Sequence, residues 1–303
     1  MALNTAAIKN LLEPGLYAVE GDYEKKPTQW SKIFKTRKST KQVEQKAQMR
    51  FLGLPALKAE GGSITFDNQS GQRSVWNARS VEVALGFAVT RLSIDDNLYQ
   101  EDFSTSSLEM AKSFSEYKET FAANVVNNGT TYDATIGGDG VALFSTAHPY
   151  DGGTWANRFA VDLDLNEASL LQACLNIRAD FRNEAGLKIN ALPEMLVVPV
   201  ALIPVAERIV KSEYRPGTAN NDINAIPSMP GGIKEYMPWD YMTSTRAWFL
   251  TTNIEGFIMF ERKKFETNMW TDDVTQNLLV SGYERYVPVN HDPRSCYGSF
   301  ATT

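Results

Sequence analysis

The residue types that most often perform acid–base or nucleophilic chemistry are few and scattered in this chain. Its only histidines are His148 and His291, and neither has a second histidine four residues away, the spacing of a helical metal site. His148 lies in a turn-rich Ser-Thr-Ala-His-Pro stretch, where a structural role is expected. Ser115 and Lys118 match Ser-x-x-Lys, but the partner motifs Ser-Asp-Asn and Lys-Thr-Gly are absent from the sequence. The sequence therefore predicts no catalytic residue.

Patterns that bind phosphate or metal are also missing. The glycine-rich segment 137–140 lacks both the Gly-Lys-Ser/Thr ending of a phosphate loop and the spacing of a dinucleotide fingerprint. Asp133, Asp139 and Asp151 are spread through turns without the ligand order of an EF-hand. Cys174 falls within an apolar helical stripe, which favours a buried role over a reactive thiol. We predict no cofactor and no metal.

Charge is distributed unevenly along the 303 residues. The formal net charge is −6, from 30 basic and 36 acidic residues. Residues 21–50 hold nine Lys/Arg and three acidic residues, whereas the other 273 residues hold 21 basic and 33 acidic ones. This basic arm predicts contact with an acidic surface, either a phosphate backbone or the acidic body of another copy of the chain. We favour the second, since it requires no foreign partner.

An alternating pattern begins at Gly61 and predicts a long two-stranded ribbon. Ile64 and Phe66 alternate with polar residues, and 67–72 supplies turn residues. In 81–89 the apolar side chains of one face, Val83 and Leu85 among them, alternate with small or polar ones. An isolated ribbon is marginal in water, so its apolar face must be covered by its own domain or by a neighbouring molecule.

Helices and further strands follow the ribbon. Ser106 and Glu109 suggest a capping box that starts a helix reaching Asn127. Further elements are expected as a helix from about Asn166 to Asn183, a buried strand at Met195–Val198, a helix with Pro204 in its first turn, and strands at Ala247–Thr251, Gly256–Glu261 and Leu278–Val289. This order predicts an α+β fold with mixed sheets and two domains.

No segment predicts secretion or membrane insertion. The N-terminal residues lack the basic and apolar regions of a signal peptide. The longest apolar stretch, Met195 to Ala206, is interrupted by two prolines and is shorter than the roughly 20 residues that cross a bilayer. A soluble protein made in a cytoplasm is expected.

Three parts of the chain are expected to project from its body: the arm, the ribbon and the long loop Glu213–Gly232. Such projections stabilise a single copy little but can bury surface between copies, which predicts a self-assembling structural subunit.

A family resemblance is carried by the order and spacing of seven short segments, namely Trp30–Phe34, Met49–Gly53, Thr90–Asn97, Leu143–Pro149, Leu196–Pro199, Gly256–Lys264 and Trp270–Asp273. Through them the whole chain resembles the major capsid (major head) protein of tailed bacteriophages, with the Hong Kong ninety-seven fold. It looks most like the Mu-type prophage major head subunit group.

The resemblance implies a division of the chain. Residues 1–52 would be the N-terminal arm and 53–90 the extended loop, a β-hairpin that lies over an adjacent subunit. Residues 91–154 and 266–303 would form the peripheral domain with its spine helix, and 155–265 the axial domain. Contacts between subunits are expected from the arm, the extended loop and an axial-domain loop, with the candidates Trp30, Ile33, Phe34, Lys35, Arg37, Lys38, Ile64, Phe66, Arg73, Trp76, Val83, Leu85, Arg215, Asn220 and Asn221.

The function implied is that of a structural, non-enzymatic subunit. Such a subunit forms the hexamers and pentamers of an icosahedral head that encloses double-stranded DNA without sequence preference. Its expected partners are further copies of itself, a scaffolding protein, a portal and a decoration protein, in a virion assembled in the cytoplasm of a bacterial host. Three alternatives stay open: an encapsulin-type nanocompartment shell, a cytosolic hydrolase and a DNA-binding accessory protein.

Overall fold

The computed structural model describes residues 28–50, 52–67, 71–96, 99–134, 138–214 and 223–301. The chain forms two compact units, each assembled from three separate stretches of sequence. Unit 1 contains Met1–Val43, Arg79–Ala122 and Met259–Pro288, and unit 2 contains Glu44–Ala78, Ala123–Ile258 and Val289–Thr303. The secondary structure is mixed α and β in several sheets, so the predicted α+β class is confirmed.

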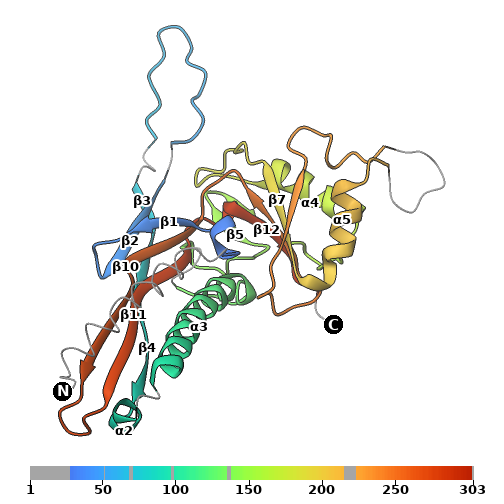
Figure 1. Ribbon diagram of the computed structural model, residues 1–303. Helices are drawn as coiled ribbons and strands as arrows, with labels where there is room; N and C mark the ends of the chain where they lie inside the picture. Colours follow the sequence, from blue (N-terminus) through green and yellow to red (C-terminus); the bar gives the residue numbers. More distant parts are fainter. Residues whose placement is uncertain are drawn as a thin grey trace. The chain divides into compact units, whose positions relative to one another are not determined.

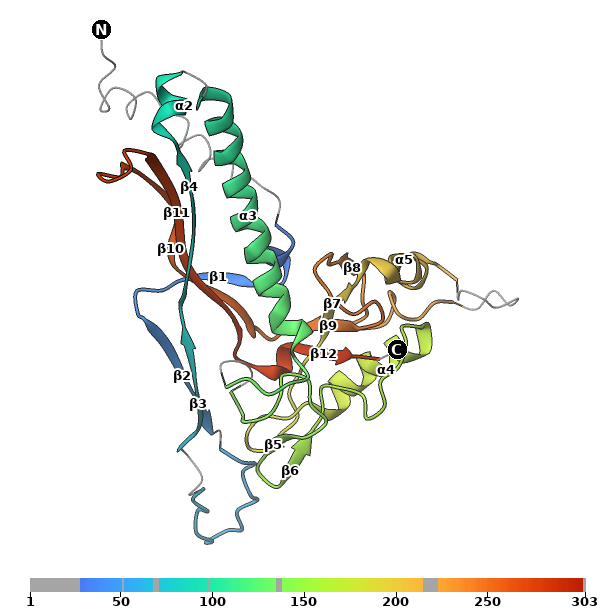
Figure 2. The same ribbon diagram turned by 90° about the horizontal axis from the view of Figure 1, so that it is seen from below.

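Unit 1 is built on a four-stranded sheet with a long helix beside it (Figures 1 and 2). Across the sheet the strands are β1 (Lys35–Lys38), β10 (Phe257–Thr271), β11 (Leu278–Asn290) and β4 (Val81–Val89). The last two residues of β11 and the first two of β10 belong to unit 2. β4 runs antiparallel to β11, with Phe87 opposite Val280.

The long helix α3 (Tyr99–Asn127) covers the sheet of unit 1. Phe103, Met110 and Phe114 of α3 pack with apolar residues of β10 and β11, and Val83 and Phe87 of β4 join this core. The helix begins before the predicted cap at Ser106, and a short helix α2 (Arg91–Asp95) precedes it, capped by the Thr90 hydroxyl. The sequence predicted this helix but not its start, because tertiary packing can extend a helix beyond a local capping signal.

The predicted ribbon is wrong in its pairing. Residues 52–67 contain no strand, and β4 pairs with β11 instead of with the segment around Ile64. The hairpin that does form joins β2 (Val43–Arg50) to β3 (Gly71–Arg79). Period-two alternation shows which face of a strand is apolar, but it does not show which strand lies beside it.

Unit 2 is built on a second four-stranded sheet with the order β12, β9, β7, β8. Its strands are β7 (Pro193–Val198), β8 (Glu235–Pro238), β9 (Trp248–Thr252) and β12 (Cys296–Ser299), and its helices are α4 (Glu167–Asp180) and α5 (Ile203–Lys211). A small hairpin of β5 (His148–Tyr150) and β6 (Gly153–Trp155) belongs to the same unit, as do the single turns η2 (Val200–Leu202) and η3 (Pro293–Ser295). The single turn η1 (Trp30–Lys32) belongs to unit 1.

The core of unit 2 contains the helices and the buried strand that the sequence predicted for this part of the chain. Leu170, Cys174 and Ile177 of α4 lie with Leu196 of β7 and Ile209 of α5 in one fully buried cluster. Pro204 occupies the first turn of α5, where its missing N–H costs nothing. α4 ends at Asp180, three residues before the predicted end. Within the part of the chain that is described, no helix has the length and apolar character of a membrane span.

Candidate assembly surfaces

The loop between β2 and β3 exposes a group of large apolar side chains. Asp67 accepts a hydrogen bond from the backbone N–H of Gly53 at 2.8 Å, which closes the base of the loop. Figures 1 and 2 show the loop extending beyond the paired ends of the two strands. Among the described residues 52–67, the exposed fraction of each large apolar side chain is 62% or more, for Leu52, Leu54, Leu57, Ile64 and Phe66. Exposed apolar clusters of this kind mark interaction surfaces.

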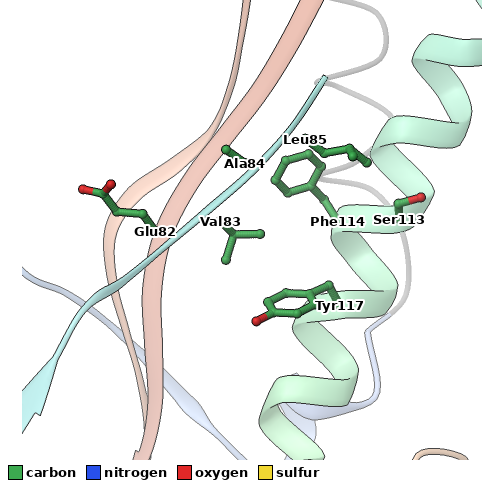
Figure 3. Close-up of a pocket in the computed structure, with 7 residues that line it drawn as sticks. All are labelled: Glu82, Val83, Ala84, Leu85, Ser113, Phe114 and Tyr117. Atoms are coloured by element: carbon green, nitrogen blue, oxygen red, sulfur yellow. The ribbon is translucent and has the colours of Figure 1, made fainter. Parts of the chain in front are cut away.

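A second apolar surface is an open groove between β4 and α3 in unit 1. Its volume is about 390 Å³, and Figure 3 shows Val83 of β4 pointing toward Phe114 and Tyr117 of α3. Phe114 is buried at its floor, whereas Leu85 and Tyr117 on its rims are 48% and 46% exposed. Glu82, Ala84 and Ser113 complete the lining. The groove therefore offers aliphatic and aromatic surface to a partner.

The described part of the basic arm is anchored to its own chain. Trp30 and Phe34 are buried, and the Glu119 carboxylate of α3 accepts hydrogen bonds from the backbone N–H groups of Gln29 at 2.5 Å and Trp30 at 3.0 Å. By contrast Lys35, Arg37 and Lys38 along β1 are exposed, and Ile33 is half-buried. The aromatic residues thus fasten the arm to unit 1, and the cations remain on its surface.

A buried ion cluster supports this anchor. The Lys118 ammonium lies 2.8 Å from a Glu261 carboxylate oxygen and 3.6 Å from one of Glu284, and its side chain is 8% exposed. The same ammonium lies over the rings of Trp30 and Tyr286, at 5.3 and 4.8 Å from their centres. The Lys118 side chain is therefore occupied by contacts within unit 1, which indicates a structural role.

The candidate contact residues are thus distributed over several places. Ile64 and Phe66 lie on the exposed loop and Val83 and Leu85 at the groove. Trp76 of β3 is buried, with its ring 5.7 Å from that of His291, so it supports the core of unit 2. The side chain of Arg73 lies outside the described residues, as do Arg215, Asn220 and Asn221.

Sequence reasoning missed several members of both surfaces. Leu52, Leu54 and Leu57 belong to the exposed loop, and their density in a short stretch without strand periodicity was the available signal. Tyr117, which nothing in the sequence singled out, lies on the rim of the groove. Its spacing matches that of the buried stripe, so no local signal separates it from Phe114.

Both cysteines and both histidines are buried. Burial raises the pKa of the Cys174 thiol to about 12 and also raises that of Cys296, which keeps both thiols protonated. His148 is completely buried. Among the described residues no group of three or more His, Cys, Asp or Glu side chains is placed to hold a metal ion.

Comparison with solved structures places this fold among capsid shells. The capsid of a native GTA particle is 13% identical, with a TM-score of 0.58, and the match covers 99% of this chain and 100% of that one. The mature capsid of bacteriophage PhiM1 is 8% identical, with a TM-score of 0.56, over 90% and 86% of the two chains. A virus-like particle from Pyrococcus furiosus is 10% identical, with a TM-score of 0.52, over 95% and 98%. Among curated proteins none matches this chain.

The fold and the family comparison together define a structural capsid protein. The family model for phage capsid protein matches residues 78–299, well over half of the chain. The chain belongs to the phage capsid protein family. Family membership points to a structural, non-enzymatic role in a virion, so the resemblance drawn from the sequence is confirmed at this level and the hydrolase alternative is set aside.

Proposed function

We propose that this chain is the subunit that forms the hexamers and pentamers of an icosahedral phage head enclosing double-stranded DNA. The observation that carries the proposal is the loop at 52–67, whose apolar side chains have no cover from the described part of the chain. Burial of each such side chain by a neighbour would contribute about 1.5–3 kcal/mol, repeated at every subunit of a shell. The groove of β4 and α3 is a second surface for a neighbour to cover.

The proposal includes the division made from the resemblance. The arm would be residues 1–52, the extended loop 53–90, the peripheral domain 91–154 with 266–303, and the axial domain 155–265. The Mu-type prophage major head group is the expected subgroup, and a scaffolding protein, a portal and a decoration protein are the expected partners. Assembly would take place in the cytoplasm of a bacterial host.

A triple substitution in the loop tests the proposal. We expect Leu54→Ser, Leu57→Ser and Phe66→Ser together to leave the subunit folded, since all three side chains are exposed, and to abolish closed shells in sedimentation and negative-stain microscopy. Glu60→Ser, an exposed change in the same loop, is the matched control and should assemble as the unaltered chain does. Shells formed equally well by the triple variant would contradict the proposal.

An encapsulin-type nanocompartment is the second candidate. It is favoured by the likeness of the fold to a virus-like particle over almost the whole of both chains. The contents of purified particles separate the two candidates. Double-stranded DNA protected from nuclease supports the phage head, whereas an enclosed protein without DNA supports the nanocompartment.

A DNA-binding accessory role rests on the basic arm. Lys35, Arg37 and Lys38 are exposed in the described part of the arm. If the unassembled subunit bound DNA with a salt-dependent affinity that was lost on deletion of residues 21–50, this role would be supported.

A further inference from the structure

Strand β4 forms an open edge of the sheet in unit 1. In the order β1, β10, β11, β4 it is the last strand, and within the part of the chain that is described its strand neighbour is β11 alone. Every second residue of an edge strand directs its backbone N–H and C=O groups to the unpaired side. The nine residues of β4 therefore offer a row of donors and acceptors to a further strand.

The two edges of this sheet differ in the side chains that protect them. At the opposite edge β1 exposes the cations Lys35, Arg37 and Lys38, and charges on an edge strand oppose the addition of another strand. β4 carries a single charged side chain, Glu82, and has no proline. Because Leu85 in its middle is an exposed apolar residue, this edge suits an extended apolar partner.

Leu85 marks the place where such a partner would add. It projects from the same side of β4 as Val83 and Phe87, which join the core of unit 1, yet it is 48% exposed. The groove of about 390 Å³ between β4 and α3 lies along this side (Figure 3). A strand added to the edge of β4 would direct alternate side chains into the groove.

The exposed loop at 52–67 contains a segment with the properties of this strand. A hydrogen-bonded turn at 59–62 reverses the loop, and residues 63–67 follow it. The segment 63–67 contains Ile, Thr and Phe, residue types that favour strands, but it forms no strand within the chain. Ile64 and Phe66 are two positions apart, hence on one face of an extended chain, and they are 66% and 81% exposed.

We propose that residues 63–67 of one copy add as an extra strand to the free edge of β4 in a second copy. Ile64 and Phe66 enter the groove there and contact Tyr117, while backbone hydrogen bonds to β4 hold the strand. The donated segment and the accepting edge are different surfaces of the chain, so the contact is head-to-tail and each copy can both give and receive a strand. Head-to-tail contacts that close produce rings, so the strand addition rests on the proposed function, whose hexamers and pentamers are such rings.

Disulfide trapping in assembled particles tests the pairing. Both cysteines of the chain are buried, so introduced cysteines form the reactive pair. The register decides whether Ile64 or Phe66 lies opposite Leu85. We therefore expect oxidation of Ile64→Cys/Leu85→Cys or of Phe66→Cys/Leu85→Cys to give a ladder of covalent multimers on denaturing, non-reducing gels. The matched control is Thr65→Cys/Leu85→Cys, which should give at least about tenfold less multimer, because Thr65 points to the opposite face.

Particle formation and cross-linking are scored separately. Particles whose chains stay unlinked in both test variants, or are linked only within single chains, overturn the strand addition and leave the proposed function standing. If the unaltered chain forms no particles under any condition, the proposed function and the strand addition both fail.

Hydrogen exchange of the unaltered chain provides a second measurement that needs no substitution. The backbone amides of 63–67 and of 81–89 should both exchange at least about tenfold more slowly in particles than in dissociated subunits. Protection of 81–89 without protection of 63–67 would show that another segment covers the edge, and it would overturn the proposal.

Discussion

The Glu119 carboxylate on α3 accepts a hydrogen bond from the backbone N–H of Trp30 at 3.0 Å, across 89 positions of sequence. Its other oxygen accepts from the N–H of Gln29 at 2.5 Å. Gln29 and Trp30 are the N-cap and the first residue of the turn η1. The Lys118 ammonium lies over the ring of Trp30. A carboxylate bound by two backbone donors is a strong acceptor, so this helix residue anchors the arm where it joins unit 1.

Replacing Glu119 with Gln should release that anchor. An amide offers one oxygen and one NH₂ group, so one of the two backbone N–H groups would face another donor. We expect a loss of about 1–3 kcal/mol at this site and faster hydrogen exchange at residues 29–34. Glu116→Gln, an exposed change one turn away, is the control and should not alter their exchange. Equal protection in both variants would show that the aromatic side chains alone hold the arm.

Replacing Lys118 with Met should be far more costly than an equivalent change at the surface. Removal of the ammonium leaves Glu261 and Glu284 close together with little solvent, and we expect a loss of about 3–5 kcal/mol in the free energy of unfolding. In the control Lys263→Met, the broken pair with Glu266 is about half exposed on each side, so the expected loss is below about 1 kcal/mol. Chemical denaturation of both variants measures the difference, and similar losses would contradict it.

Substitutions at two positions of β4, Val83 and Leu85, should affect folding and assembly differently. Val83 packs against the core of unit 1, so Val83→Asp should lower the free energy of unfolding by at least about 2 kcal/mol. Leu85 is on the exposed rim of the groove, so Leu85→Asp should change it by less than about 0.5 kcal/mol and still impair assembly. Thermal unfolding and sedimentation are the measurements. The control Ala88→Asp lies on the same strand but outside the groove, so it should neither lower the free energy of unfolding nor impair assembly.

His291 should make the protein sensitive to acid. Burial and the positive charge of Lys46 lower the pKa of its imidazole, although Asp292 and the Gly256 carbonyl act in the opposite direction. The folded chain therefore favours the neutral ring. The unfolded chain takes up a proton near the ordinary value of about 6.5, so stability is retained above that pH and lost below it.

We expect the unfolding midpoint to fall between about pH 7 and about pH 5 and the fall to be smaller in His291→Gln. Lys46→Gln should also make this fall in the unfolding midpoint smaller, because it removes the positive charge that opposes protonation of His291. An unchanged acid response in His291→Gln would refute the assignment to this residue.

Local patterns in the sequence were sufficient for the parts of the fold that depend on a single element. The apolar stripe of α4, with Cys174 inside it, the buried strand at Met195–Val198 and the Pro204 helix start are all where periodicity and capping predicted them. They could be predicted because each reports the side of one helix or strand that turns away from water. The same patterns, through their order, were sufficient for the α+β class and the capsid family.

Only the tertiary structure determined which segments meet. Alternation in 81–89 is equally compatible with a ribbon partner near Ile64 and with β11, and long-range packing selects β11. From the sequence Trp30 was a candidate for contact between subunits, yet it is buried within the chain, where Glu119 and Lys118 lie about ninety positions away in sequence and adjacent in space. The orientation of the Asn157 amide likewise depends on the carbonyl oxygen of Pro293, 136 positions away in sequence. The buried face of each element can be predicted from the sequence, since it depends on neighbours along the chain. The pairing of elements cannot, since it depends on residues far apart in sequence.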